Sequence, residues 1–356
     1  MKQNGFFHSL ARVVFKGEKV TNPPWPRMIL CAVATLAPLL FGFFRGEISI
    51  AIFGGLAGYL LALNDHLGSL GHRLWVTTLS ALILAFGFVL GTLAQNDPII
   101  YFGILASVTY WLGLLGGEGA ELERAVLFAL IIFVTAVTTP GITTDILAPL
   151  GMYGLIAYGC LILGGPIVFF LRRDQAAVHA RLRESLRISW TLKYERHIHA
   201  ACFTATVLFA VWFSNEFQIE HGSGVVMTVL IVLRPDRLLT VYKTLQRFFG
   251  TLAGVLVADL IVVAHPTVPL SLLLLTVCAF VIPWALLKNY WLTTFLVTIF
   301  VVLLLEIASG HNGSLHVGTL RLQSTFIGCC LSLIGVGLAR GIDRIAKHFK
   351  LFQPPA

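Results

Sequence analysis

The segment 270–287, LSLLLLTVCAFVIPWALL, is eighteen residues long and contains no charged side chain. An apolar run of this length is what a helix needs to cross the hydrocarbon core of a bilayer. Such a run favours a transmembrane helix over a buried strand, because strands are much shorter. The segment therefore predicts a membrane-spanning helix, and the rest of the chain repeats the pattern.

Eleven further apolar runs occur, although several are shorter than a full bilayer crossing. The twelve predicted spans cover residues 28–44, 48–63, 74–94, 99–115, 125–138, 150–171, 200–213, 225–233, 248–264, 270–287, 291–308 and 325–338. Helices satisfy their own backbone hydrogen bonds, which lipid requires of a spanning segment. We therefore predict an all-α integral membrane protein with about twelve transmembrane helices.

The composition also points to lipid as the main solvent. Charged residues make up only 12% of the 356 residues, and hydrophobic residues make up 57%, whereas soluble domains carry about 25% charged residues. The six cysteines lie in apolar runs without metal-site spacing, where thiols act as small hydrophobes. We expect no disulfide, no metal and no other cofactor.

The net charge of +8 would suggest nucleic-acid binding in a soluble protein. Here the placement of the cations decides otherwise. With the N-terminus in the cytoplasm, all Lys and Arg residues except Arg45 and Arg321 fall on the cytoplasmic side, while the outer loops are neutral or acidic. This asymmetry follows the positive-inside rule. It predicts cytoplasmic N- and C-termini and no nucleic-acid partner.

The chain reads as two similar halves of six spans each. In both halves a short, Gly-containing span leads into a basic turn, and Arg73-Leu74-Trp75-Val76-Thr77 aligns with Arg247-Phe248-Phe249-Gly250-Thr251. Because six is an even number, the halves have the same orientation in the membrane. We predict two parallel six-helix repeats, at residues 28–171 and 200–340.

Three segments lie outside the predicted repeats. Residues 1–27 are expected to form a short helix at the membrane surface or a partly ordered cytoplasmic tail. The basic residues 172–199 are expected to form a cytoplasmic linker helix that rests on lipid headgroups or docks a partner. Residues 341–356 form the predicted cytoplasmic tail.

Charged residues within predicted spans mark a pathway or a structural pair, because an isolated charge in lipid is costly. Asp259 and Glu306 lie toward the outer ends of their spans, and Arg321 opens the last span from the outer side. One interpretation is a structural ion pair of Arg321 with either carboxylate. The other is a proton-titrating carboxylate beside a cation that attracts an anionic substrate.

Glycines interrupt the second span of each half, and the span at 225–233 also ends at Arg234-Pro235. Matched interrupted spans are typical of broken helices that hold ions or substrates, but small residues serve tight helix packing equally well. A basic cluster follows, formed by Arg234, Arg237, Lys243 and Arg247. It either fixes topology and binds anionic lipid, or forms an electropositive entrance for organic anions.

The signatures of common enzymes and pumps are missing from the sequence. No HExxH, P-loop or GxSxG motif occurs, and the histidines form no set of closely spaced clusters. We therefore expect that the chain is not an enzyme and does not itself pump with ATP.

Four elements stand out in the second half. They are the short span with its Arg-Pro end at 222–235, the Arg-x-x-Gly-Thr-x-x-Gly block at 247–254, Asn289-Tyr290, and the segment 321–328. Together they resemble one known family, the fusaric acid resistance proteins. The resemblance covers about 110 residues. It implies a bacterial inner-membrane protein that exports aromatic or other organic acids, often beside a periplasmic adaptor subunit. The family is also similar to plant aluminium-activated malate channels.

Together these features predict efflux of organic anions, above all aromatic carboxylates, driven by an ion gradient or by the substrate gradient. The predicted substrate-binding residues, which are cationic, hydrogen-bonding or aromatic, are Arg234, Arg247, Thr251, Asn289, Tyr290 and Arg321. Asp259 and Glu306 are the predicted proton-coupling residues. The alternatives are a passive organic-anion channel and a non-transporting membrane scaffold. The expected partners are the anion, membrane lipid and the adaptor, and a homo-oligomer is left open.

Overall fold

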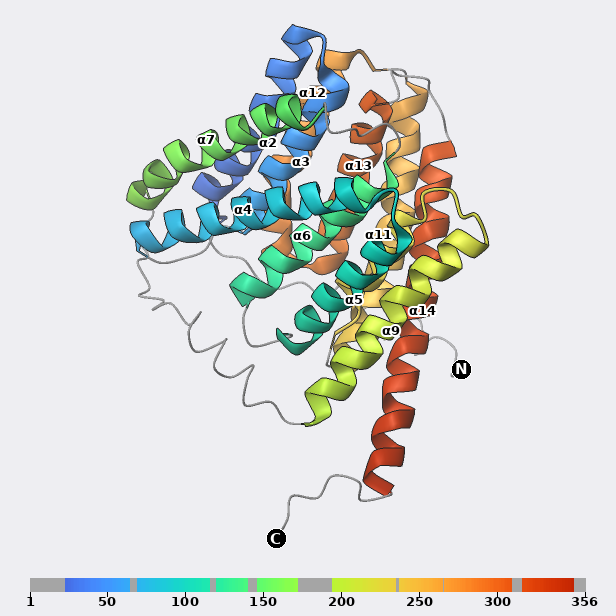
Figure 1. The fold of residues 1–356 in the computed structure, drawn as a ribbon. Helices are drawn as coiled ribbons and strands as arrows, with labels where there is room; N and C mark the ends of the chain where they lie inside the picture. Colours follow the sequence, from blue (N-terminus) through green and yellow to red (C-terminus); the bar gives the residue numbers. More distant parts are fainter. Residues whose placement is uncertain are drawn as a thin grey trace, which may run out of the picture. The chain divides into compact units, whose positions relative to one another are not determined.

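The computed structural model describes residues 23–64, 69–115, 120–139, 146–171, 194–234, 237–264, 266–308 and 316–348. Within these ranges the chain is helical and contains no strand (Figure 1). The predictions for the N-terminal segment up to residue 22, for the linker at 172–193 and for the tail beyond residue 348 lie outside these ranges.

Twelve helices follow one another along the described chain. They are α2 (Trp25–Arg45), α3 (Ile48–Leu63), α4 (Leu70–Ala94), α5 (Pro98–Leu115), α6 (Ala120–Thr138), α7 (Leu147–Leu171), α9 (Tyr194–Glu216), α10 (Ser223–Val232), α11 (Arg237–Val263), α12 (Val268–Lys288), α13 (Tyr290–Ala308) and α14 (His316–His348). Each predicted span overlaps one of these helices, so the predicted all-α architecture is confirmed.

The helices have the length and surface of membrane spans. Nine of those in the described ranges are long and apolar enough to cross a bilayer, while α3 and α10 are shorter apolar helices. Large apolar side chains remain exposed along them, such as Phe170, which is 77% exposed. Contiguous apolar surface of this kind would drive aggregation in water, whereas lipid solvates it. The protein is a multi-pass membrane protein.

Several helices extend beyond their apolar runs at basic ends. Helix α11 begins at Arg237 rather than at residue 248, and α14 continues to His348 rather than ending at 338. Charged side chains end an apolar run without interrupting the backbone hydrogen bonds of the helix. Long Lys and Arg stems also let such a helix continue into the headgroup region.

The chain forms two compact units, each drawn from both halves of the sequence. Unit 1 comprises Met1–Ala85, Ile142–His179 and Leu245–Gln323, and unit 2 comprises Phe86–Gly141, Ala180–Thr244 and Ser324–Ala356. Helices α4, α11 and α14 therefore contribute to both units.

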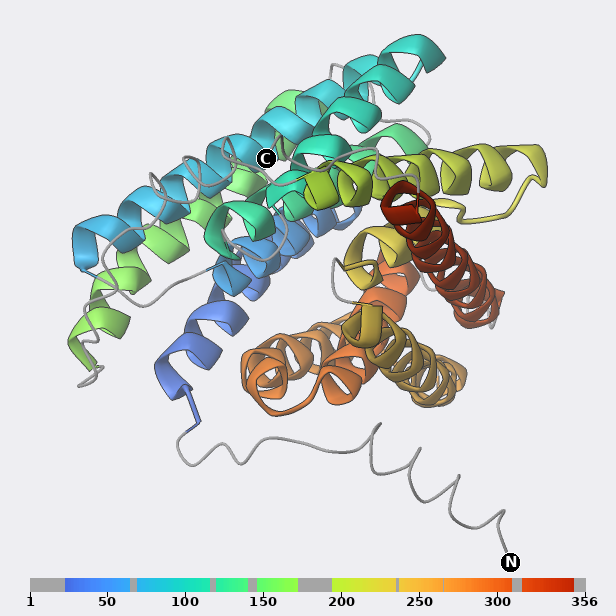
Figure 2. The same ribbon diagram turned by 90° about the horizontal axis from the view of Figure 1, so that it is seen from below.

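In unit 1, α2 packs against α3, α7 and α12, and α13 packs against α3 and α12. Figure 2 shows α12 and α13 side by side in orange. The glycines of α3 allow its close contacts: a Cβ at Gly58 would overlap the carbonyl of Ala34, and one at Gly54 would lie 2.5 Å from Cβ of Tyr153. Helix α3 is unbroken, so its glycines serve helix packing.

In unit 2, α9 packs against α5 and α10, and α6 packs against the same two helices. Their facing side chains form a buried apolar core that includes Phe133, Phe203 and Val229. Helix α14 meets α10 at Gly328, where a Cβ would lie 2.6 Å from Cβ of Thr228. It meets α9 at Gly335, where a Cβ would lie 2.5 Å from Oγ1 of Thr206.

Candidate functional site

Seven of the eight predicted site residues belong to unit 1, although they come from three helices and one helix cap. These seven are Arg247, Thr251, Asp259, Asn289, Tyr290, Glu306 and Arg321. The eighth, Arg234, belongs to unit 2. Two separate places are therefore described, one in each unit.

Arg247 is a buried cation inside a candidate membrane span. It lies ten residues into α11, is only 5% exposed, and its Nε has no hydrogen-bond partner among the described residues. Thr251 lies one turn further along the same face of α11 and is also buried. A guanidinium and a hydroxyl thus share one buried stripe, which provides several hydrogen-bond donors and one permanent positive charge.

Two glycines between and beyond these residues set the position of α11 against α13. A Cβ at Gly250 would lie 2.7 Å from the carbonyl oxygen of Trp291, and one at Gly254 would lie 2.7 Å from Cβ of Thr298. Small residues four apart allow such backbone contact between membrane helices. The predicted Arg-x-x-Gly-Thr-x-x-Gly block therefore combines a close packing seam with a buried cation.

Arg247 lies within electrostatic range of Arg321 on α14 and of Tyr59 on α3. The ring of Tyr59 stacks on that of Phe300 in α13, with centroids 4.8 Å apart and an angle of 26° between the planes. Both aromatic residues are buried. Tyr59 comes from the first half of the chain, and hydropathy could not have shown that it lies within electrostatic range of Arg247.

Asn289 has a structural role that its predicted role as a ligand did not include. Its Oδ1 accepts hydrogen bonds from the backbone N–H of Trp291, at 2.9 Å, and from Nε2 of Gln246, at 3.3 Å. The first bond caps the N-terminus of α13, and the second joins α11 to that cap. Tyr290, which is half-buried, begins α13 directly after it.

The two predicted proton-coupling residues differ in their surroundings. Asp259 of α11 is half-buried, and its carboxylate lies against Gly318 of α14, where any Cβ would overlap it. Gly318 precedes Arg321 by three residues, so Asp259 contacts α14 about one helical turn before Arg321. Glu306 of α13 is fully buried.

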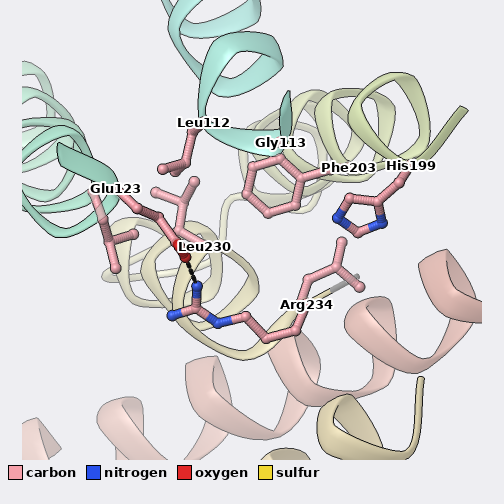
Figure 3. A pocket seen from close by; sticks show the side chains of 9 residues that line it. Leu112, Gly113, Glu123, His199, Phe203, Leu230 and Arg234 are labelled. Carbon is pink, nitrogen blue, oxygen red and sulfur yellow. Dashed lines mark hydrogen bonds and ion pairs between the residues drawn. The ribbon is translucent and has the colours of Figure 1, made fainter. Parts of the chain in front are cut away.

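In unit 2, Arg234 forms an ion pair with Glu123 of α6 (Figure 3). The pair lies in a small pocket between α5, α6, α9 and the end of α10. Its lining is Leu112, Gly113, Glu123, Leu127, His199, Phe203, Leu230, Leu233 and Arg234. His199 and Glu123 approach this pocket from different helices. The pairing joins residues 111 positions apart in the sequence, and sequence analysis missed Glu123.

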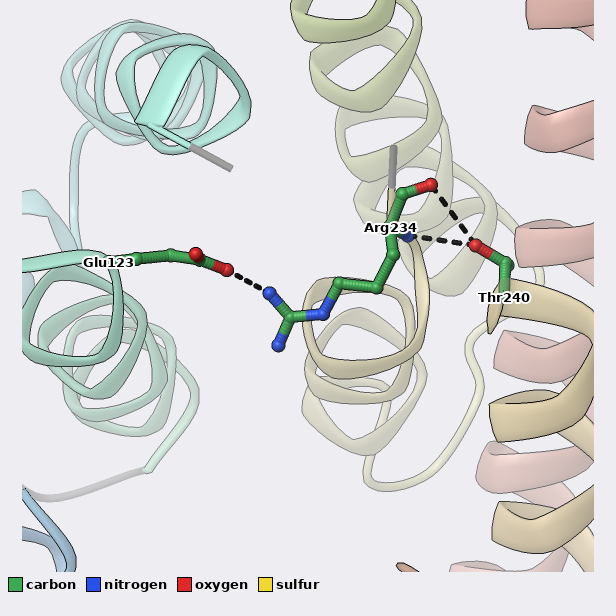
Figure 4. A network of polar contacts seen from close by, with 3 residues as sticks. All are labelled: Glu123, Arg234 and Thr240. Carbon is green, nitrogen blue, oxygen red and sulfur yellow. Dashed lines mark hydrogen bonds and ion pairs between the residues drawn. The ribbon is translucent and has the colours of Figure 1, made fainter. Parts of the chain in front are cut away.

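The backbone of Arg234 is held by Thr240, in the first turn of α11 (Figure 4). The N–H of Arg234 donates to Oγ1 of Thr240 at 3.0 Å, and that hydroxyl donates back to the carbonyl of Arg234 at 3.1 Å. Helix α10 ends at Val232, and its C-cap residue Leu233 is extended. These contacts fix the backbone of Arg234 against α11, while its guanidinium points toward Glu123 of α6.

Comparison with known proteins supports the resemblance in the second half. Residues 204–335 match the family model described as fusaric acid resistance protein-like. An uncharacterized protein of Haemophilus influenzae is 26% identical over 138 residues, which is 39% of this chain and 19% of that protein. The match thus spans about a fifth of the length of that relative. No solved structure matches the chain.

The family match confirms the predicted resemblance over the region that carries Arg247, Thr251, Asn289, Tyr290 and Arg321.

Proposed function

We propose that this protein exports organic anions, with aromatic carboxylates as the main class, and that Arg247 binds the anionic group within unit 1. The single observation that carries the proposal is a nearly inaccessible arginine in a candidate span whose Nε has no hydrogen-bond partner among the described residues. Burying a cation away from water costs several kcal/mol unless an opposite charge compensates. A substrate carboxylate would supply that charge and would suit the planar guanidinium.

The neighbours of Arg247 support an anion with an aromatic body. Tyr59 and Phe300 offer a stacked aromatic pair within reach of the cation, and aromatic rings gain about 0.5–1.5 kcal/mol from well-placed ring partners. Thr251 would donate a hydrogen bond to the carboxylate from the turn next to Arg247. Tyr290 would contribute a third ring near the start of α13, and Arg321 would add positive charge from α14.

Asp259 is the proposed proton-coupling residue, with Glu306 as the second candidate. Its carboxylate is half-buried in a candidate span, a position where protonation and deprotonation change the cost of exposure to lipid. Its contact with Gly318 lies close to Arg321 on α14. A change of charge on Asp259 would therefore act on the helix that carries Arg321.

The proposed tandem repeat is supported by the helix partners within each unit. In unit 1, α2 packs against α3, α7 and α12, α3 packs against α7 and α13, and α12 packs against α13. In unit 2, α9 packs against α10, α14 and α5, α10 packs against α14 and α6, and α5 packs against α6. Each helix pair named above for unit 1 has its counterpart in unit 2 when α2 is matched to α9, α3 to α10, α7 to α14, α12 to α5 and α13 to α6. Each repeat would then lend its fourth and fifth helices to the other.

Flux measurements test the proposal. Purified protein in liposomes should move labelled benzoate faster than empty vesicles, and a pH gradient should increase the rate. A conductance without any dependence on the pH gradient would favour the passive channel. No flux of benzoate above empty vesicles, with or without the gradient, would refute transport of this class.

A further inference from the structure

The carboxylate of Asp259 on α11 fills the space that a side chain at position 318 of α14 would occupy. A Cβ built on Gly318 would overlap Oδ1 of Asp259 and would lie 2.8 Å from its Cγ and 2.9 Å from its Oδ2. By contrast, Gly337 and Gly341 on the same helix have no atom within 4 Å of an added Cβ. Asp259 can therefore hold its position only because residue 318 is glycine.

This contact lies at the first turn of α14, which begins at His316. The N–H groups of a first helical turn have no acceptor within the helix, and the helix dipole places partial positive charge there. An ionised carboxylate is stabilised beside such a turn, whereas a protonated one is not. The contact between Asp259 and α14 thus depends on whether the carboxyl group carries its proton.

The other ionisable groups near this contact come from α13 and α14. Asp259 is the only charged residue in the segment 252–263 of α11, and Glu306 is the only one in α13. Helix α14 supplies His316 in the contacted turn and Arg321 one turn later. Because the side chain of His316 lies outside the described part of the chain, a variant at this position is needed as a control.

We propose that Gly318 is the positioning residue for proton coupling by Asp259: it admits the carboxylate to the first turn of α14, which holds the ionised form and releases the protonated form. This inference rests on the proposed function of Asp259. Asp259 lies four residues before the end of α11, which is about 6 Å along the helix axis, so a proton can reach it from water at that end. Protonation then frees this turn of α14 from α11, and loss of the proton restores the contact.

Gly318→Ala tests the proposal, because its methyl group displaces the carboxylate from the first turn. In proteoliposomes, a pH gradient should stimulate benzoate flux through Gly318→Ala at most about half as much as through the parent protein. Exchange of labelled for unlabelled benzoate without a gradient should stay close to that of the parent protein. The controls Gly337→Ala, on the same helix, and His316→Gln should both keep the full stimulation.

A second measurement does not depend on transport. Dicyclohexylcarbodiimide, which is apolar, adds to a protonated carboxyl group within a membrane and leaves an N-acylurea there without a leaving group. Mass spectrometry of the peptide that contains Asp259 should show at least about twofold more modification at pH 7 in Gly318→Ala than in Gly337→Ala, because the displaced carboxylate loses the stabilisation of its ionised form. Asp259→Asn should show no modification at this position.

Equal stimulation of flux in Gly318→Ala and Gly337→Ala would overturn the proposal, and so would equal labelling of Asp259 in the two variants. A loss of stimulation in His316→Gln as large as that in Gly318→Ala would assign the proton to the histidine instead. If the parent protein does not move benzoate, the proposed function fails, and the labelling alone decides the role of Gly318.

A second variant covers the case in which Gly318→Ala does not fold. Asp259→Glu keeps an ionisable carboxyl group but moves it one methylene group away from its position against Gly318. It should lose stimulation by the pH gradient in the same way, and full stimulation in Asp259→Glu would refute the proposal.

Discussion

Tyr153 of α7 donates a 2.7 Å hydrogen bond from its hydroxyl to Oε2 of Glu47, in the turn that joins α2 to α3. Arg45 lies on the other side of this carboxylate, with Nη2 3.4 Å from Oε1. The hydrogen bond from Tyr153, assisted by the charge of Arg45, lowers the pKa of Glu47 below its ordinary 4.5. The turn is thus tied to α7 by an ionised carboxylate.

This contact predicts a pH-dependent contribution to stability. A carboxyl whose pKa is lowered in the folded state stabilises the fold above its unfolded pKa, and the contribution disappears as the pH falls through the folded pKa. Tyr153→Phe should therefore lower the melting temperature in detergent at pH 7, and the difference from the parent protein should shrink below pH 4.5. A difference that stays constant through the acid range would contradict the role of Glu47.

The contact of α11 with α13 predicts that Gly254 cannot be enlarged. Its added Cβ would lie 2.7 Å from Cβ of Thr298 and 2.8 Å from the carbonyl oxygen of Phe295. Gly254→Ala should lower the free energy of unfolding by about 1–3 kcal/mol, as overpacking does. Gly103→Ala is the matched control, because no atom lies within 4 Å of its added Cβ. Equal effects of the two substitutions would show that the seam tolerates a methyl group.

The stacked pair of Tyr59 and Phe300 predicts selectivity for aromatic substrates. Tyr59→Leu should raise the KM for benzoate about two- to tenfold, in line with the free energy of an aromatic contact, and should leave the KM for hexanoate nearly unchanged. Tyr59→Phe keeps the ring and should stay within about twofold of the parent protein. A parallel loss for both acids in Tyr59→Leu would indicate a packing defect instead.

Asp259 is predicted to couple transport to protons. Asp259→Asn keeps the shape of the side chain but cannot ionise, so the pH gradient should no longer stimulate benzoate flux, while exchange of labelled for unlabelled benzoate should continue. Glu216→Gln serves as the control, because this carboxylate is exposed at the end of α9. Unchanged stimulation in Asp259→Asn would exclude Asp259 as the coupling residue and leave Glu306 to be tested.

Hydropathy was sufficient to locate the helices but not to pair them. The run at 270–287 predicted α12 to within two residues at either end. The packing of α12 against α2, by contrast, joins segments more than 200 residues apart. Which face of an apolar helix meets which neighbour depends on shape, as at Gly58 and Gly254, and many arrangements of similar apolar helices share one hydropathy profile.

The same limit of sequence-based prediction applies to the candidate sites. Hydropathy placed Arg247 in a cytoplasmic basic turn, because the apolar run begins only at residue 248, whereas the structure places it buried inside α11. Glu123 could not be assigned to Arg234, since nothing local links α6 to the end of α10. The capping role of Asn289 could have been predicted, because Asn directly before a helical run is a common N-cap.

The central claim is that the buried guanidinium of Arg247 binds the transported anion. Benzoate flux into proteoliposomes should be compared for the parent protein, Arg247→Gln and the exposed control Arg45→Gln, each with its melting temperature. We predict that Arg247→Gln reduces benzoate flux at least about tenfold without lowering the melting temperature. This corresponds to a loss of about 1.4 kcal/mol or more of transition-state stabilisation. Arg45→Gln should keep the flux of the parent protein. Flux through Arg247→Gln equal to that of the parent protein would contradict the claim.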